Sequence, residues 1–268
     1  MFFPLENNPV YAPTDPKDQS ALLAALEKAV DMVPSGASKL VTCRYLVRLA
    51  YVAAMSGLAE TVENAAKFLS RNDLKGLRKH LEEADVVHRG GQCPGIIVRE
   101  QIAVMLPRYM KVVGNKIATL LSDCTSCFAD LKRRQALCKA MSRIFNLYSD
   151  ECFAIEGCGP YKNKRLAEVI ILACLSPKIA VPHMTQDDLH ALGGVWPLPD
   201  GSRRGLRKIF PGLRNKMRQQ QGVKALSIVM GSGGNCKSVP ASTISAMLCF
   251  WNEHKNGVLS WVPEWKPK

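Results

Sequence analysis

Residues 18–81 constrain the fold most strongly, because their apolar positions recur at spacings of three and four over several consecutive segments. Such spacing places apolar side chains on one face of an α-helix. The triplet Pro34-Ser35-Gly36 interrupts the first segment, since proline cannot continue a helix and glycine lets the backbone turn. Residues 45–55 are apolar on almost every side, which predicts a buried helix. The stretch therefore predicts a compact helical bundle.

Polar residues mark where these helices should begin. Asp15 before Pro16 can bond the free N–H groups of the first helix. Ser38 can do the same for the helix that carries residues 45–55, and Asn72 for a fourth helix. The expected apolar stripes are Leu22, Leu23, Leu26, Val30 and Val33 in the first helix, Leu58, Val62, Ala66 and Leu69 in the third, and Leu74, Leu77 and Leu81 in the fourth.

The rest of the chain also favours helices. Helical spacing predicts separate helices over 96–106 and 110–121, and a longer one over 125–148. Strict alternation of apolar and polar residues persists nowhere, so the fold class should be all-α, with a multi-helix bundle N-terminal domain and a second, basic, mostly helical C-terminal region. The composition changes near residue 176, where prolines become frequent. The expected parts are an extended arm over 1–14, the helical bundle over 15–175 and the basic region over 176–268.

The charge of the chain points to anionic partners. Lys and Arg number 36 against 23 Asp and Glu, a formal net charge of +13. Phosphate backbones and anionic lipid surfaces are the natural counterparts of such a charge. No apolar stretch reaches the roughly 18 residues of a membrane span, so membrane contact should be peripheral. The 10 cysteines are scattered, which favours reduced thiols in a cytosolic or nuclear setting.

The strongest candidate site is a basic segment in the C-terminal region. Between residues 201 and 252 there is no acidic residue against nine Lys or Arg. Clustered bases without acids attract phosphates and anionic lipid headgroups. A shorter cluster lies on the helix expected over 125–148. The candidate residues are Arg203, Arg204, Arg207, Lys208, Arg214, Lys216 and Arg218 in the first cluster, and Lys132, Arg133, Arg134 and Lys139 in the second. The alternative for each cluster is an ordinary solvated helix face.

Motifs for catalysis or cofactor binding are incomplete. Cys124 and Cys127 have the spacing of half a zinc site, but the second close pair is missing. Residues 231–238 approach a phosphate-binding loop, yet Cys236 stands where the loop needs glycine. No spacing singles out a nucleophile with its base, and no paired carboxylates suggest a cleft. We therefore expect no enzyme, no cofactor and no metal site.

The opening of the chain resembles that of a viral family. A leucine pair, a glutamate and a valine lead into Pro34-Ser35-Gly36, followed by a long helix, a short one and the run from Asn72 to Leu77. In this order the elements are similar to the start of influenza-type (orthomyxovirus, thogotovirus-like) matrix proteins. The likeness covers roughly the first third of the chain, and the stretch from Ala167 to Cys174 is similar to a later helix of the family.

The resemblance implies a viral matrix protein of the virion. Such a protein self-assembles as a homo-oligomer under the envelope, touching anionic membrane on one face and viral ribonucleoprotein or RNA on the other. It implies host cytoplasm, nucleus and inner membrane face as locations, and it makes Lys132, Arg133 and Arg134 part of the binding surface. A Cys/His cluster of the family would fall on Cys174, His183 and His190, but Ser176 departs from that pattern, so these remain weak metal candidates.

Two other functions fit the same features. An RNA-encapsidating nucleoprotein of a segmented negative-strand virus is also helical and basic, and it would carry a deep basic groove. A cellular helical nucleic-acid-binding or adaptor protein is the third possibility. The distribution of the bases in three dimensions separates these functions, since a flat basic face favours membrane binding or layer assembly and a groove about one strand wide favours encapsidation.

Overall fold

The computed structural model is all-α, with about 84% of its described residues in helices and no strand among them. It describes residues 16–56, 59–83, 101–125, 200–213 and 215–232, with positions 143, 166, 169, 170, 172–174, 176, 178, 179, 198, 244, 245, 247–249, 251 and 252. The chain divides into two compact units, residues 1–188 (unit 1) and 189–268 (unit 2). The expected arm over 1–14 and most of the helix expected over 125–148 lie outside the described residues.

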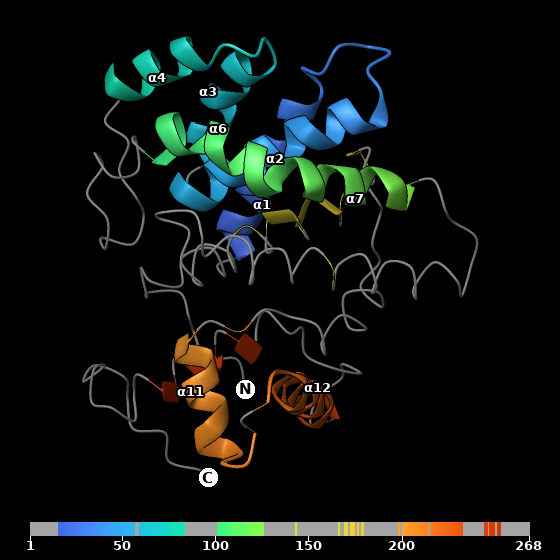
Figure 1. Cartoon of the computed structure of the whole chain (residues 1–268), viewed down its shortest axis with the longest axis vertical. Helices are drawn as coiled ribbons and strands as arrows, with labels where there is room; N and C mark the ends of the chain where they lie inside the picture. The colour runs from blue at the N-terminus through green and yellow to red at the C-terminus, as the bar shows by residue number, and fades with distance from the viewer. Residues whose placement is uncertain are drawn as a thin grey trace. The chain divides into compact units, whose positions relative to one another are not determined.

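Helix α2 (Lys39–Ser56) is the centre of unit 1 (Figure 1). It packs against α1 (Pro16–Val30), α3 (Ala59–Leu69), α7 (Asn115–Thr125) and the π-helical segments η3 (Gln101–Met105) and η4 (Met110–Gly114). Because neighbours cover most of its circumference, almost every residue from 45 to 55 is buried. This confirms the prediction made from its all-round apolar character. The cap at Ser38 is also confirmed, since the Val41 N–H donates to Ser38 Oγ at 3.3 Å.

A buried tyrosine joins the first three helices. The Tyr45 hydroxyl of α2 lies 3.1 Å from the Ala29 carbonyl oxygen of α1 and 3.1 Å from the Ala66 carbonyl oxygen of α3. Burial raises the pKa of Tyr45 to about 12, because the phenolate would lose its hydration. The side chain therefore stays neutral and keeps its proton for these two acceptors.

The fourth helix, α4 (Leu74–Glu83), does not begin as expected. Asp73, rather than Asn72, is its cap, because the Gly76 N–H donates to Asp73 Oδ1 at 2.8 Å. Asn72 instead adopts a positive φ of 54°, a conformation that asparagine tolerates better than most residues. Its side-chain oxygen accepts a hydrogen bond from Arg48 Nη1 at 2.9 Å. The turn between α3 and α4 is thereby tied to α2.

Residues 101–125 form one helical run instead of the two separated helices that were expected. The run passes from η3 through the short α6 (Leu106–Tyr109) and η4 into α7. Pro107 lies in the first turn of α6. A proline has no N–H to donate, which changes the hydrogen-bond pattern without ending the helix at this position. The inner side of the run is apolar and buried, at Ile102, Leu106, Met110, Val113, Ile117 and Leu121.

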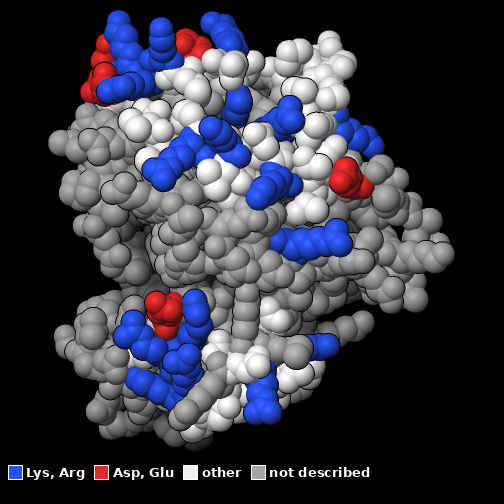
Figure 2. All heavy atoms as spheres, viewed as in Figure 1, with Lys and Arg blue, Asp and Glu red and all other residues white. Residues whose placement is uncertain are grey.

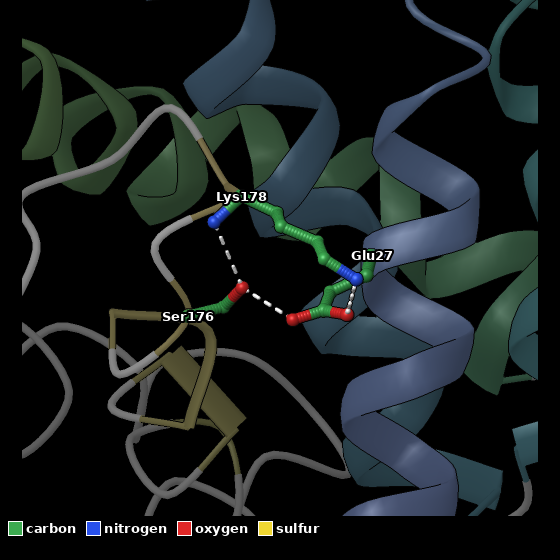
Figure 3. Close-up of polar contacts among 3 residues, drawn as sticks. All are labelled: Glu27, Ser176 and Lys178. Carbon is green, nitrogen blue, oxygen red and sulfur yellow. Dashed lines mark hydrogen bonds and ion pairs between the residues drawn. The ribbon is translucent and has the colours of Figure 1, made fainter.

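A polar cluster attaches Ser176 and Lys178 to α1 (Figure 3). Ser176 Oγ donates to Glu27 Oε1 at 2.5 Å and accepts the Lys178 N–H at 3.2 Å. Lys178 Nζ lies 3.2 Å from Glu27 Oε2. The Ser176 hydrogen bond, and more weakly Lys178, lowers the pKa of Glu27 against the opposing effect of burial. Glu27 is therefore held in the ionised form that both partners need.

Unit 2 contains α11 (Asp200–Ile209) and α12 (Lys216–Ser232), which pack together. Three small residues of α11, Gly201, Ser202 and Gly205, lie against Cys249, Ser245 and Leu248 respectively. Ser202 Oγ donates to the Ser245 carbonyl at 2.6 Å. At Gly205 an added Cβ would overlap the Leu248 carbonyl oxygen and lie 2.8 Å from its carbonyl carbon. Backbone therefore packs directly on backbone at this point.

Candidate polyanion-binding surfaces

Two neighbouring helical segments of unit 1 carry bases and no acids. The sequence has no Asp or Glu from residue 32 to 59, which includes α2, or from 101 to 122, which includes most of the run through α7. Because α2 packs against α7, η3 and η4, the two acid-free segments lie side by side. Their six bases are here called the unit 1 basic face: Lys39, Arg44, Arg48, Arg108, Lys111 and Lys116.

The bases on this face are open to solvent. All are exposed except Arg48, which is partly buried. Burial, and secondarily the positive charge of Arg44, lowers the pKa of Arg48. In Figure 2, Lys and Arg side chains are spread over the region of α2, α6, η4 and α7, whereas acidic side chains gather mainly beside α4. The bases cover an area rather than following a single line.

Bases elsewhere in unit 1 are more often paired with acids. On α4, Arg78 lies 2.9 Å from Glu82 and Lys79 lies 3.8 Å from Glu83, while Lys28 of α1 lies 2.7 Å from Glu63 of α3. Within the part of the chain that the structure describes, no acid lies within ion-pair distance of Arg44, Arg108 or Lys111. Among the described residues, the positive charge of Arg44, Arg108 and Lys111 is therefore not offset by a neighbouring acid.

Apolar side chains accompany the bases, but exposed aromatic ones do not. Val41 precedes Arg44 on the exposed stripe of α2 and is 46% exposed; Val104 is four residues before Arg108 and is 52% exposed. The tyrosines of the same elements, Tyr45, Tyr51 and Tyr109, are all buried. Single-stranded nucleic acids are usually bound on exposed aromatic rings. The described part of this face offers charge and small apolar contacts without such rings.

The basic segment predicted in the C-terminal region proves to be mostly helical. The structure brings Arg203, Arg204, Arg207 and Lys208 together on α11 and places Arg218 on the neighbouring α12. Arg204, Arg207 and Arg218 are exposed. The side chains of Arg214 and Lys216, and the whole second cluster of Lys132, Arg133, Arg134 and Lys139, lie outside what the structure describes.

Part of the α11 cluster has local partners. Arg203 Nε donates to the Leu198 carbonyl at 2.8 Å, and its guanidinium lies 3.5 Å from Asp200. Lys208 Nζ donates to the Asn252 carbonyl at 3.3 Å. Arg207 and Lys208 occupy the last turn of the helix, where cations interact favourably with the helix dipole. Arg204 and Arg207 are therefore the members of this helix most available to an anion.

The weak metal candidates are not brought together among the described residues. Cys174 is buried in unit 1, while His183 and His190 lie outside the described residues, as do Cys127 and the side chain of Cys124. The described residues contain no group of three or more potential ligands. Ser176 stands where the resemblance would place a second cysteine, and its hydroxyl donates a hydrogen bond to Glu27 Oε1.

The unit 1 basic face was missed at the level of sequence. The acid-free runs around α2 and α7 were visible signals, but each carries only three bases and neither looks dense alone.

Among the described helices, none is long and apolar enough to cross a membrane. A scan of protein-family models, a search of curated proteins and a search of solved structures each found no match to this chain.

Proposed function

We propose that this chain is a viral matrix protein that lines an envelope as a self-assembled layer and binds anionic membrane through the unit 1 basic face. The observation that carries the proposal is the packing of two acid-free helical segments into one surface with six bases. Each base near an anionic lipid surface contributes on the order of 1 kcal/mol. Six such contributions are enough for firm peripheral binding without a membrane span.

Lipid is favoured over RNA as the partner of this face for two reasons. The bases are spread over several helices, and the nearby tyrosines are buried, so the face lacks rings on which bases of RNA could stack. Val41 and Val104 are exposed beside the bases and suit the apolar boundary below lipid headgroups. Ribonucleoprotein contact is assigned to α11, where Arg204 and Arg207 are exposed.

The resemblance to influenza-type matrix proteins supports the viral and self-assembling parts of the proposal. The corresponding locations are the virion beneath its envelope, the host cytoplasm and nucleus, and the inner face of a host membrane. Neither catalysis nor a bound cofactor belongs to this role. The alternatives are an encapsidating nucleoprotein and a cellular nucleic-acid-binding or adaptor protein.

The test compares lipid binding with protection of RNA. The full chain is expected to float with phosphatidylserine vesicles free of RNA, with binding that weakens steeply as salt increases. Nuclease digestion of single-stranded RNA in its presence should leave ragged fragments. A discrete protected length together with no affinity for vesicles would identify a nucleoprotein instead. Affinity for neither partner would favour a cellular adaptor.

A further inference from the structure

The stripe of α2 that reaches solvent is short and mostly basic. Of the 18 residues of α2, 13 are buried. The others are Lys39, Leu40, Val41, Arg44 and Arg48. Every residue of α2 after Arg48 is buried, and Arg48 itself is partly buried. Arg48 is therefore the inner end of this stripe.

The guanidinium of Arg48 is held by a contact outside its own helix. Its Nη1 donates to Asn72 Oδ1 at 2.9 Å, and Asn72 belongs to the turn between α3 and α4. An arginine has several N–H donors, so this single bond leaves the others for a ligand. A side chain that is already held in place loses less conformational freedom when it binds an anion.

Arg44 lies one helical turn before Arg48 on the same stripe. Residues four apart in an α-helix are neighbours on its surface. The pKa of Arg48 is lowered by burial and, secondarily, by the positive charge of Arg44, so the two guanidiniums lie close enough to interact. Within the described part of the chain, no acid lies within ion-pair distance of either one. An anion between them would remove their mutual repulsion.

A phosphate monoester is the anion that suits such a pair best. Arginine binds phosphate through two parallel N–H donors, a geometry that lysine lacks. A phosphate monoester carries about 1.5–2 negative charges at pH 7 and has three acceptor oxygens, so it can bind two guanidiniums at once. A phosphodiester, such as the phosphate of phosphatidylserine, has less charge and fewer free oxygens.

We propose that Arg44 and Arg48 form a binding site for the phosphate monoester headgroup of a membrane lipid, with Asn72 as the residue that positions Arg48. This inference rests on the proposed membrane role of the unit 1 basic face, and it names the lipid headgroup that the face prefers. Val41, which is exposed three residues before Arg44, suits the apolar boundary below the headgroups.

The test compares two kinds of vesicle with equal surface charge. One kind contains phosphatidic acid, whose headgroup is a phosphate monoester, and the other contains phosphatidylserine. The native full chain should bind the phosphatidic acid vesicles about tenfold more tightly, which corresponds to one additional charge-assisted interaction. Arg48→Lys keeps the charge but loses the two parallel donors, so the preference should disappear. Retention of the full preference by Arg48→Lys would overturn the site.

Asn72→Gly tests the positioning role. Glycine tolerates the positive φ at this position, so the variant removes the amide oxygen without straining the turn. The preference for phosphatidic acid should fall roughly threefold, the loss of one hydrogen bond. A merely structural effect would weaken binding to both kinds of vesicle and leave the ratio of the two affinities unchanged. The matched control is Arg78→Lys on α4, an exposed arginine paired with Glu82, which should keep the native ratio.

Inorganic phosphate distinguishes a lipid headgroup from a soluble phosphate. At constant ionic strength, phosphate in the millimolar range should leave most of the native chain on phosphatidic acid vesicles. Complete release would assign the arginine pair to a soluble phosphate and overturn the lipid assignment. Equal affinity of the native chain for the two kinds of vesicle would overturn the site alone. Absence of binding to either kind would overturn the proposed membrane role itself.

Discussion

Replacing Arg44, Arg108, Lys111 and Lys116 together with serine is expected to weaken binding to phosphatidylserine vesicles roughly a thousandfold. The four side chains are exposed members of the unit 1 basic face. Each contributes on the order of 1 kcal/mol near an anionic surface, and 1.4 kcal/mol corresponds to a factor of ten. The measurement is a vesicle titration at fixed ionic strength, followed by sedimentation or flotation of the full chain.

A second quadruple variant separates the position of the charges from their number. Replacing Lys67, Lys75, Arg78 and Lys79 with serine removes the same charge from α3 and α4, where two of the bases are paired with Glu82 and Glu83. This variant should lose less than about tenfold in affinity. Exposed charges contribute little to stability, so both variants should stay folded. Equal losses in the two would mean that net charge, and not the unit 1 basic face, determines binding.

Replacing Gly205 with alanine is expected to destabilise unit 2 by about 3 kcal/mol. Alanine favours a helix interior over glycine by roughly 0.5–1 kcal/mol, so without a steric conflict the change would be stabilising. The conflict is with backbone, because the new Cβ would overlap the Leu248 carbonyl oxygen. Backbone cannot move aside as a flexible side chain does, so α11 must separate from the segment around residue 248.

Tryptophan fluorescence reports this change selectively. All four tryptophans, Trp196, Trp251, Trp261 and Trp265, belong to unit 2. In a urea titration, the fluorescence transition of Gly205→Ala should occur at clearly lower denaturant. Gly212→Ala is the matched control, because nothing lies within 4 Å of its added Cβ, and its transition should stay where it is or move slightly upward. Coincident transitions for Gly205→Ala and the native chain would contradict the close packing of α11.

A helix could be predicted from the sequence where its own pattern of apolar residues is enough to show that it is buried. The all-round apolar character of residues 45–55 is sufficient to predict a buried helix, and Ser38 caps it as expected. The cap of α4 could not be decided locally, since Asn72 and Asp73 are both good caps. Arg48 of α2 bonds the Asn72 side chain, so a contact from a distant helix leaves Asp73 as the cap.

The candidate binding surface could be predicted only in part, because helices far apart in the sequence pack together to form it. The cluster on α11 is dense in sequence and was found, although the bonds of Arg203 and Lys208 to nearby carbonyls were not foreseeable from spacing. The unit 1 basic face joins α2 to a segment about 60 residues later in the chain. Apolar spacing had also predicted two separate helices over 96–106 and 110–121, whereas residues 101–125 form one run.

Chemical modification of lysines tests the membrane role of the unit 1 basic face most directly. The full chain is treated briefly with an acetylating reagent, with and without phosphatidylserine vesicles, and each lysine is quantified by mass spectrometry. Lys111 and Lys116 should be protected by the vesicles, whereas the exposed Lys67 and Lys75 on α3 and α4 should react equally in both samples. Equal reactivity of Lys111 and Lys116 with and without bound vesicles would contradict the membrane role of this face.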